Sequence, residues 1–224
     1  MMKNNVTWWE KFSPTIMEAE VPQKFINIIN NTGDEVLEDN GLSKKFDFSD
    51  NLVGKVHKEV SIPVPENDKG YCLSILRQAC VRYLRHMVTQ GRAYEWTKAS
   101  GGKEPSEENI KLSQSWIVSQ YKHEYNPIHT HSGHFSGVIY LKLPDGMENH
   151  FNEETKDHYP ASGLIEFSHG EKLDFKSDTL MFKPVVGQML VFPNWLKHTV
   201  YPFYCDGERR SMSFNAYWKN NDNN

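Results

Sequence analysis

Residues 209–215 read Arg-Arg-Ser-Met-Ser-Phe-Asn, and polar and apolar side chains alternate along the last five of them. Successive side chains of a β-strand point to opposite faces, so every second residue from Arg209 to Asn215 lies on one face, while Met212 and Phe214 lie on the other. Such a polar face borders either solvent or a ligand cavity. The alternation predicts a strand and leaves these two environments open.

The rest of the second half of the chain shows the same two-residue period from about Leu112 onward. Its short alternating runs are separated by clusters of Gly, Pro, Asn and Asp, which are typical of turns between strands. The runs that we expect to be strands are 113–121, 134–143, 163–167, 179–183, 188–192, 198–202 and 209–218. Many short strands at close intervals predict a sandwich or a barrel.

The first half has a mixed pattern. A short strand is predicted at 16–21, followed by a helix at 23–31. The clearest helix spans 71–90, where apolar residues recur at steps of three and four. Residues 99–109 contain two adjacent glycines and no apolar period, so they predict an exposed loop.

These patterns indicate one domain with three parts. We expect residues 1–110 to form a mixed α/β portion that supports a β core at 111–218, with 219–224 as a tail. A chain of 224 residues can bury a single hydrophobic core of this kind.

The composition limits the partners of the protein. The formal net charge is -4, so no basic surface for nucleic acid is indicated. No apolar run is long enough to span a bilayer, and the start of the chain lacks a signal-peptide pattern, which predicts a cytoplasmic protein. Three cysteines without CxxC spacing predict reduced thiols.

The histidines contain a metal-binding pattern. In His129-Thr-His131 the two imidazoles lie two residues apart, and on a strand they would share a face and could meet one ion. A third ligand must come from elsewhere in the chain. His198 is the candidate, because it follows the buried strand predicted at 188–192 and begins the next strand.

Four motifs occur in a fixed order between Ser113 and Trp218. They are Asn126-Pro-Ile-His-Thr-His131, Ser136-Gly-Val-Ile-Tyr-Leu141, Gly187 through Phe192-Pro to His198, and Arg209-x-Ser211. In this order they resemble the 2-oxoglutarate/Fe(II) dioxygenase superfamily, in particular an oxygenase group found in phage and bacterial genomes. The resemblance implies a double-stranded β-helix, a cupin-like jelly roll, with flanking helices and the α/β portion packed on it.

The resemblance also assigns the metal ligands. His129, His131 and His198 are expected to hold Fe(II) and to leave positions open for 2-oxoglutarate and O2. The superfamily commonly has a carboxylate where this sequence has His131. A neutral imidazole there leaves more positive charge on the iron, which weakens its retention and raises its redox potential.

The resemblance assigns the co-substrate contacts as well. Arg209 is expected to bind the distal carboxylate of 2-oxoglutarate, because a guanidinium is planar, always charged and bidentate. Ser211 and Tyr140 are expected to add hydrogen bonds. Asn126 is a further candidate contact, with shaping of the turn at Pro127 as its alternative role.

The expected reaction is hydroxylation of a substrate that the sequence does not identify, coupled to conversion of 2-oxoglutarate to succinate. Two alternatives remain open: a three-histidine cupin-like metalloenzyme that does not use 2-oxoglutarate, and a binding module without turnover. Residues 147–159 are acidic and predict either a surface loop or a lid over the site. A homodimer is compatible with the sequence but not indicated by it.

Overall fold

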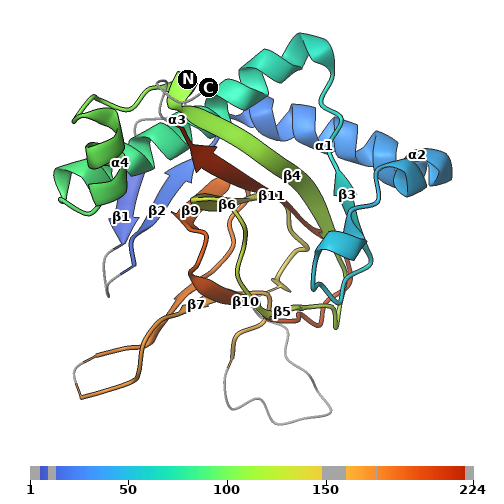
Figure 1. The fold of residues 1–224 in the computed structure, drawn as a ribbon. Helices are drawn as coiled ribbons and strands as arrows, with labels where there is room; N and C mark the ends of the chain where they lie inside the picture. Colours follow the sequence, from blue (N-terminus) through green and yellow to red (C-terminus); the bar gives the residue numbers. More distant parts are fainter. Residues whose placement is uncertain (1–5, 10–13, 148–159, 175, 220–224) are drawn as a thin grey trace.

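The computed structural model describes residues 6–9, 14–147, 160–174 and 176–219. Two antiparallel sheets face each other (Figure 1). The larger sheet has the strand order β1-β2-β9-β6-β11-β4-β3, and the smaller has the order β5-β10-β7-β8. The strands are β1 (Val6–Trp9), β2 (Ile16–Glu20), β3 (Lys58–Ser61), β4 (Ile110–Gln120), β5 (Asn126–His129), β6 (Phe135–Lys142), β7 (Ile165–Ser168), β8 (Thr179–Phe182), β9 (Gln188–Pro193), β10 (Lys197–Val200) and β11 (Arg209–Trp218).

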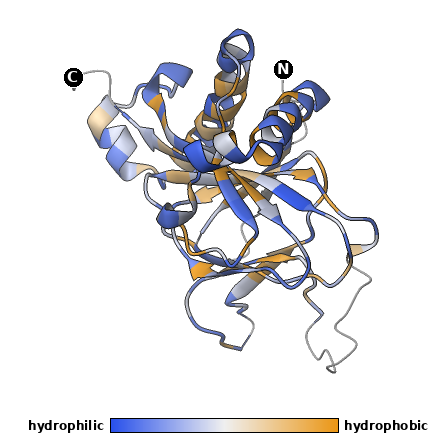
Figure 2. Ribbon diagram, turned by 90° about the vertical axis from the view of Figure 1, so that its right-hand side faces the viewer, coloured by the Kyte–Doolittle hydropathy of each residue, from blue (hydrophilic) through white to orange (hydrophobic). Residues whose placement is uncertain are grey.

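The helices lie on the outer face of the larger sheet, as Figure 1 shows for the two longest of them. They are α1 (Gln23–Glu38), α2 (Asn40–Lys45), α3 (Glu66–Thr89) and α4 (Tyr94–Ser100), with single 3-10 turns η1 (Ser49–Asn51) and η2 (Glu107–Asn109). Figure 2 shows hydrophilic residues on the outward faces of the long helices and apolar residues toward the sheet. None of the helices described is long and apolar enough to cross a membrane.

The path of the chain after η2 defines the fold. Strands β4, β6, β9 and β11 belong to the larger sheet, while β5, β7, β8 and β10 belong to the smaller one. The chain therefore passes back and forth between the sheets, which is the winding of a double-stranded β-helix. The predicted fold is confirmed. From the first half of the chain, β1 and β2 extend one edge of the larger sheet and β3 forms the other edge.

The alternation in β11 places its two faces in different environments. Met212 and Phe214 are fully buried in the core between the larger sheet and the helices. Ser211 and Ser213 face the opposite way and line a cavity between the two sheets. The polar face of the strand therefore borders a cavity and not solvent.

Gly137 allows the close packing of β6 against β11. It is paired with Phe214 in the strand register. A Cβ atom at this position would collide with two carbon atoms of the Phe214 ring. The glycine in the Ser136-Gly-Val motif is thus explained by the aromatic ring that lies across it.

The seven strands predicted in the second half are all present, with ends shifted by at most three residues. The predicted strand at 16–21 and the helices at 23–31 and 71–90 are also present, although α1 extends to Glu38 and α3 begins at Glu66. The loop predicted at 99–109 is wrong at both ends, since α4 includes Ser100 and η2 begins at Glu107. Of the predicted lid or loop, residues 148–159 lie outside the described residues.

Candidate metal centre

Two of the three histidines come from adjacent strands of the smaller sheet, and the third lies just beyond the end of one of them. His129 ends β5 and is paired directly with His198 of β10. His131 lies in the loop after β5, so our expectation that the pair shares a strand face is wrong for this residue. Its backbone is held by Asn194 instead: the His131 N–H donates to the Asn194 carbonyl at 2.9 Å, and the Asn194 side chain donates to the His131 carbonyl at 3.1 Å.

Backbone carbonyls fix the orientation of two of the imidazole rings. Nδ1 of His129 lies 2.6 Å from the carbonyl oxygen of Pro127, and Nδ1 of His198 lies 2.9 Å from that of Leu196. Because a carbonyl only accepts, each Nδ1 carries the proton and each Nε2 carries a lone pair. Metal-binding histidines are commonly held in this way.

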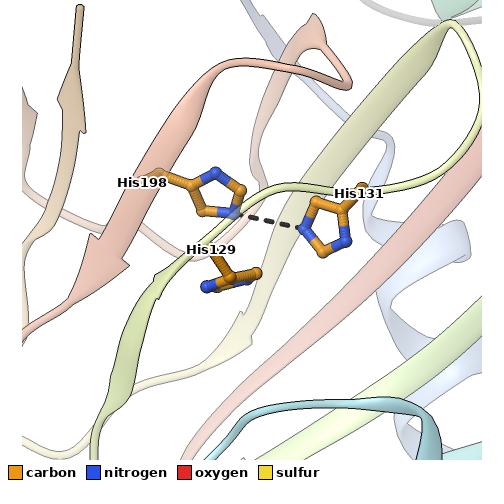
Figure 3. A group of neighbouring side chains, drawn as sticks. All are labelled: His129, His131 and His198. Carbon is orange, nitrogen blue, oxygen red and sulfur yellow. Dashed lines mark hydrogen bonds between the residues drawn. The ribbon is translucent and has the colours of Figure 1, made fainter.

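The ligand atoms converge on one point (Figure 3). One ring nitrogen from each of His129, His131 and His198 can be chosen so that all three lie within 4.8 Å of one another. The Nε2 atoms of His131 and His198 are 3.2 Å apart. Two nitrogen ligands about 2.1 Å from one ion and at right angles are separated by about 3.0 Å. The observed spacing therefore suits either a shared proton or a shared cation.

The surroundings keep these imidazoles neutral. Burial lowers the pKa of His129, lowers that of His131 to about 3 and lowers that of His198 well below its ordinary value. The rings of Phe167 and Phe192 lie 5.6 and 4.9 Å from the His198 ring. Only neutral imidazole offers a lone pair to a metal, so the site is prepared for a cation at neutral pH.

A cavity of about 260 Å³ extends from the histidines across the inner face of the larger sheet. Its volume is slightly below the roughly 300 to 1,000 Å³ of typical ligand pockets. Arg209 lines the same cavity as the three histidines. Among the described residues that line this cavity, it is the only lysine or arginine. The predicted positive charge and the predicted metal ligands therefore share one space.

Arg209 is buried without a full set of partners. Its side chain is 2% exposed, and Nη1 donates to Gln120 Oε1 at 2.9 Å. Its Nε and Nη2 groups have no hydrogen-bond partner. The guanidinium carbon lies 5.1 Å from the centre of the Tyr140 ring, and burial lowers the pKa of Arg209. A buried cation with free donors is the arrangement that an anionic ligand would complete.

The other predicted contacts lie near this guanidinium. Tyr140 is fully buried, and its hydroxyl has no hydrogen-bond partner. Burial raises the pKa of Tyr140, while the positive charge of Arg209 acts against that rise. Ser211 is paired with Tyr140 in the β11–β6 register and lines the cavity. Tyr140 itself is not among the lining residues and lies in the apolar cluster between the sheets.

The neighbouring Arg210 points to the opposite face of the sheet. It forms ion pairs with Glu208 and with Asp34 of α1, both at 2.8 Å. Two adjacent arginines thus have separate environments: one faces the cavity, and the other joins the sheet to a helix. This agrees with the alternation predicted for the strand.

The structure adds one acidic residue that the sequence did not single out. Glu59 of β3 lines the cavity, is 2% exposed and has an Oε1 atom without a hydrogen-bond partner. The Oδ1 atom of Asn126 also lacks a partner. Asn126 was predicted as a co-substrate contact. Glu59 was not predicted as a site residue, because nothing in the short Lys-Glu-Val-Ser run of β3 shows that this strand pairs with β4.

Comparisons with known proteins agree with this geometry. Residues 114–215 match a family model described as "Putative 2OG-Fe(II) oxygenase". No curated protein sequence matches the chain.

Two prolyl hydroxylases of known structure align with most of the chain. A prolyl hydroxylase from Trichoplax adhaerens, in complex with a hypoxia inducible factor oxygen degradation domain peptide fragment, aligns over 92% of this chain and 84% of its own, with 12% identity and a TM-score of 0.53. A prolyl-4-hydroxylase from Pseudomonas putida aligns over 92% of each chain, with 13% identity and a TM-score of 0.44.

The Trichoplax likeness supports the double-stranded β-helix, and the family match covers the three histidines together with Arg209. Over residues 114–215 the predicted resemblance to the 2OG-Fe(II) oxygenases is confirmed, and with it the enzyme class and the Fe(II) and 2-oxoglutarate that the resemblance implies.

Proposed function

We propose that the protein is a hydroxylase that uses Fe(II), 2-oxoglutarate and O2, with His129, His131 and His198 as the iron ligands and Arg209 as the anchor of 2-oxoglutarate. The observation that carries this proposal is that two nitrogens of the Arg209 guanidinium have no hydrogen-bond partner, in the same cavity as three converging imidazoles. A buried cation without an anion is costly, so its retention beside a metal centre favours an anionic co-substrate.

Iron with bound 2-oxoglutarate supplies the chemistry: O2 is activated, 2-oxoglutarate becomes succinate and CO2, and one oxygen atom is inserted into a C–H bond of the substrate. The protein holds the reactants. The backbone carbonyls that accept from Nδ1 of His129 and His198 leave the Nε2 lone pair of each ring for the metal. To bind the same metal through Nε2, His131 must also carry its proton on Nδ1. Its neutral ring is suited to that tautomer.

Arg209 has two groups of free donors for the distal carboxylate. Its Nη1 is held by Gln120, which fixes the guanidinium plane and leaves Nε and Nη2 for a ligand. Ser211 and Tyr140 stand in one register row, and we assign their hydroxyls to the same carboxylate. Asn126 was expected among these contacts, and we reassign it below.

The test is succinate formation. Purified protein is incubated with Fe(II), ascorbate and 2-oxoglutarate in air, and succinate is quantified by mass spectrometry. The wild type should form succinate slowly even without a substrate, and Arg209→Ala should reduce the rate at least tenfold at limiting 2-oxoglutarate. Anaerobic samples and samples without iron are the controls.

Two other outcomes would redirect the proposal. Metal binding without succinate and without 2-oxoglutarate binding would favour the cupin-like metalloenzyme. Binding of 2-oxoglutarate that gives no succinate, with or without candidate substrates, would favour a module that has kept the pocket and lost turnover.

A further inference from the structure

Glu59 belongs to the inner face of the sheet through its strand register. It is paired with Val118 of β4, and Val118 is paired with Ser211 of β11. Paired residues of antiparallel strands have side chains on the same face. Glu59 therefore stands in the same row as Ser211 and Tyr140, at the edge of the cavity, while its neighbour Val60 faces the helices.

A second acceptor stands beside this carboxyl group. A Cβ atom on Gly54 would lie 2.7 Å from Glu59 Oε1, 3.0 Å from Glu59 Oε2 and 3.1 Å from Asn126 Oδ1. The carboxyl group and the amide oxygen are therefore neighbours on one side of Gly54, and Oε1 and Oδ1 have no hydrogen-bond partner. Both residues line the cavity that holds the histidines. With Glu59 ionised, the pair is an acceptor site without a donor.

The protein itself offers little to satisfy it. Among the described residues that line the cavity, Arg209 is the only one with a permanent positive charge, and the proposed function assigns that charge to 2-oxoglutarate. The charge that raises the pKa of Glu59 beyond the effect of burial is the carboxylate of Asp47, which repels the ionised form. A buried carboxyl group without a partner destabilises the fold, and such a group commonly serves a ligand.

We propose that Glu59 and Asn126 bind a cationic nitrogen group of the primary substrate, an ammonium or a guanidinium. This inference rests on the proposed function, because it assigns the metal side of the cavity to Fe(II) and 2-oxoglutarate. A cationic group with several N–H donors satisfies the carboxyl oxygen and the amide oxygen together. Leu52 and Val53 line the cavity as well and supply apolar surface for the carbon chain that bears the cation.

The experiment uses three probes of similar shape and different charge: butylguanidinium, butylurea and pentanoate. Each is titrated by calorimetry into protein loaded with Mn(II) and 2-oxoglutarate. We expect butylguanidinium to bind at least tenfold more tightly than butylurea. We expect pentanoate to give no binding signal. Glu59→Gln should remove the preference for the cation, while the exposed control Glu66→Gln should keep it.

Folding of the variant is checked by thermal unfolding. A structural role for Glu59 predicts that Glu59→Gln is less stable, whereas a ligand anchor predicts equal or greater stability. Unchanged cation preference in Glu59→Gln, or no binding of butylguanidinium to the wild type, would overturn the proposal.

The same titration on metal-free protein separates this proposal from the proposed function. Cation binding that depends on Glu59 there supports the anchor even if Mn(II) and 2-oxoglutarate do not bind. If the wild type does not bind 2-oxoglutarate but still prefers the cation, the proposed function is contradicted and the cation anchor is not.

Discussion

The buried carboxyl group of Glu59 should make the stability of the protein fall as the pH rises. Burial, with a smaller contribution from Asp47, raises its pKa from 4.5 to about 7. Below the lower value the group is protonated in both states and adds no pH dependence. Between the two values the unfolded chain releases its proton while the folded chain keeps it, so the free energy of unfolding falls.

The size of this loss follows from the pKa difference. Each pKa unit corresponds to about 1.4 kcal/mol, so the full loss is on the order of 3 kcal/mol and is complete above about pH 7. Glu59→Gln has no proton to lose and should lack this fall. Relative to the wild type, the variant should therefore gain on the order of 3 kcal/mol between about pH 4 and pH 8.

The assay is urea unfolding followed by tryptophan fluorescence at the two pH values, for the wild type and Glu59→Gln. Other titrating groups cancel in the difference between the two proteins. Glu66→Gln serves as the control, because its side chain is 86% exposed and should give no such difference. If wild type and Glu59→Gln show the same pH dependence, or if the variant is less stable at the higher pH, the carboxyl group has a partner that this account lacks.

Three further substitutions test other parts of the structure. Gly137→Ala should destabilise the fold by about 1 to 3 kcal/mol, because the added methyl group meets the Phe214 ring, and urea unfolding measures the loss. Tyr140→Phe should leave the stability unchanged or raise it by about 1 kcal/mol, because it removes an unpartnered buried hydroxyl, yet weaken 2-oxoglutarate binding in calorimetry. Arg210→Ala should cost about 1 to 3 kcal/mol, because Glu208 loses one of its two cations and keeps only Lys142 and the Ser119 hydroxyl, with little effect on 2-oxoglutarate affinity; a large effect would contradict the separation of the two arginines.

Patterns within single strands were sufficient to predict where those strands lie and which way their side chains point. The alternation in β11 predicted that Arg209 and Ser211 share a face opposite Met212 and Phe214, and the structure has them so. The strand of Ser136-Gly-Val-Ile-Tyr-Leu is buried on both faces, and its apolar run was sufficient to locate it. The first feature depends on the two-residue period of a strand and the second on an unbroken apolar run, and both are visible in the sequence itself.

Features that depend on contacts between distant segments were not predictable in this way. Strand β3 has four residues and a weak pattern, and only its pairing with β4 turns Glu59 into the cavity. His131 lies beyond the end of its strand and is positioned by Asn194, a residue 63 positions away in the sequence. The helix α1 continues past the predicted Asn31 because Thr32, Gly33 and Val36 are buried.

Unsatisfied groups mark the site more clearly than any single motif. Eight buried polar side-chain atoms lack a partner among the described residues, and five of them belong to Arg209, Tyr140, Asn126 and Glu59. Native proteins usually satisfy such groups, so their concentration between the two sheets indicates that ligands complete them. Pre-organised sites of this kind commonly lower the stability of the fold.

The most direct measurement is a pair of calorimetric titrations, first with Mn(II) and then with 2-oxoglutarate, on the wild type, His198→Ala and Arg209→Ala. The wild type should bind one metal ion and then one 2-oxoglutarate; Arg209→Ala should keep the metal and lose at least tenfold in 2-oxoglutarate affinity, and His198→Ala should lose both. Wild-type metal affinity in His198→Ala, or wild-type 2-oxoglutarate affinity in Arg209→Ala, would contradict the assignment of these residues to one metal and co-substrate site.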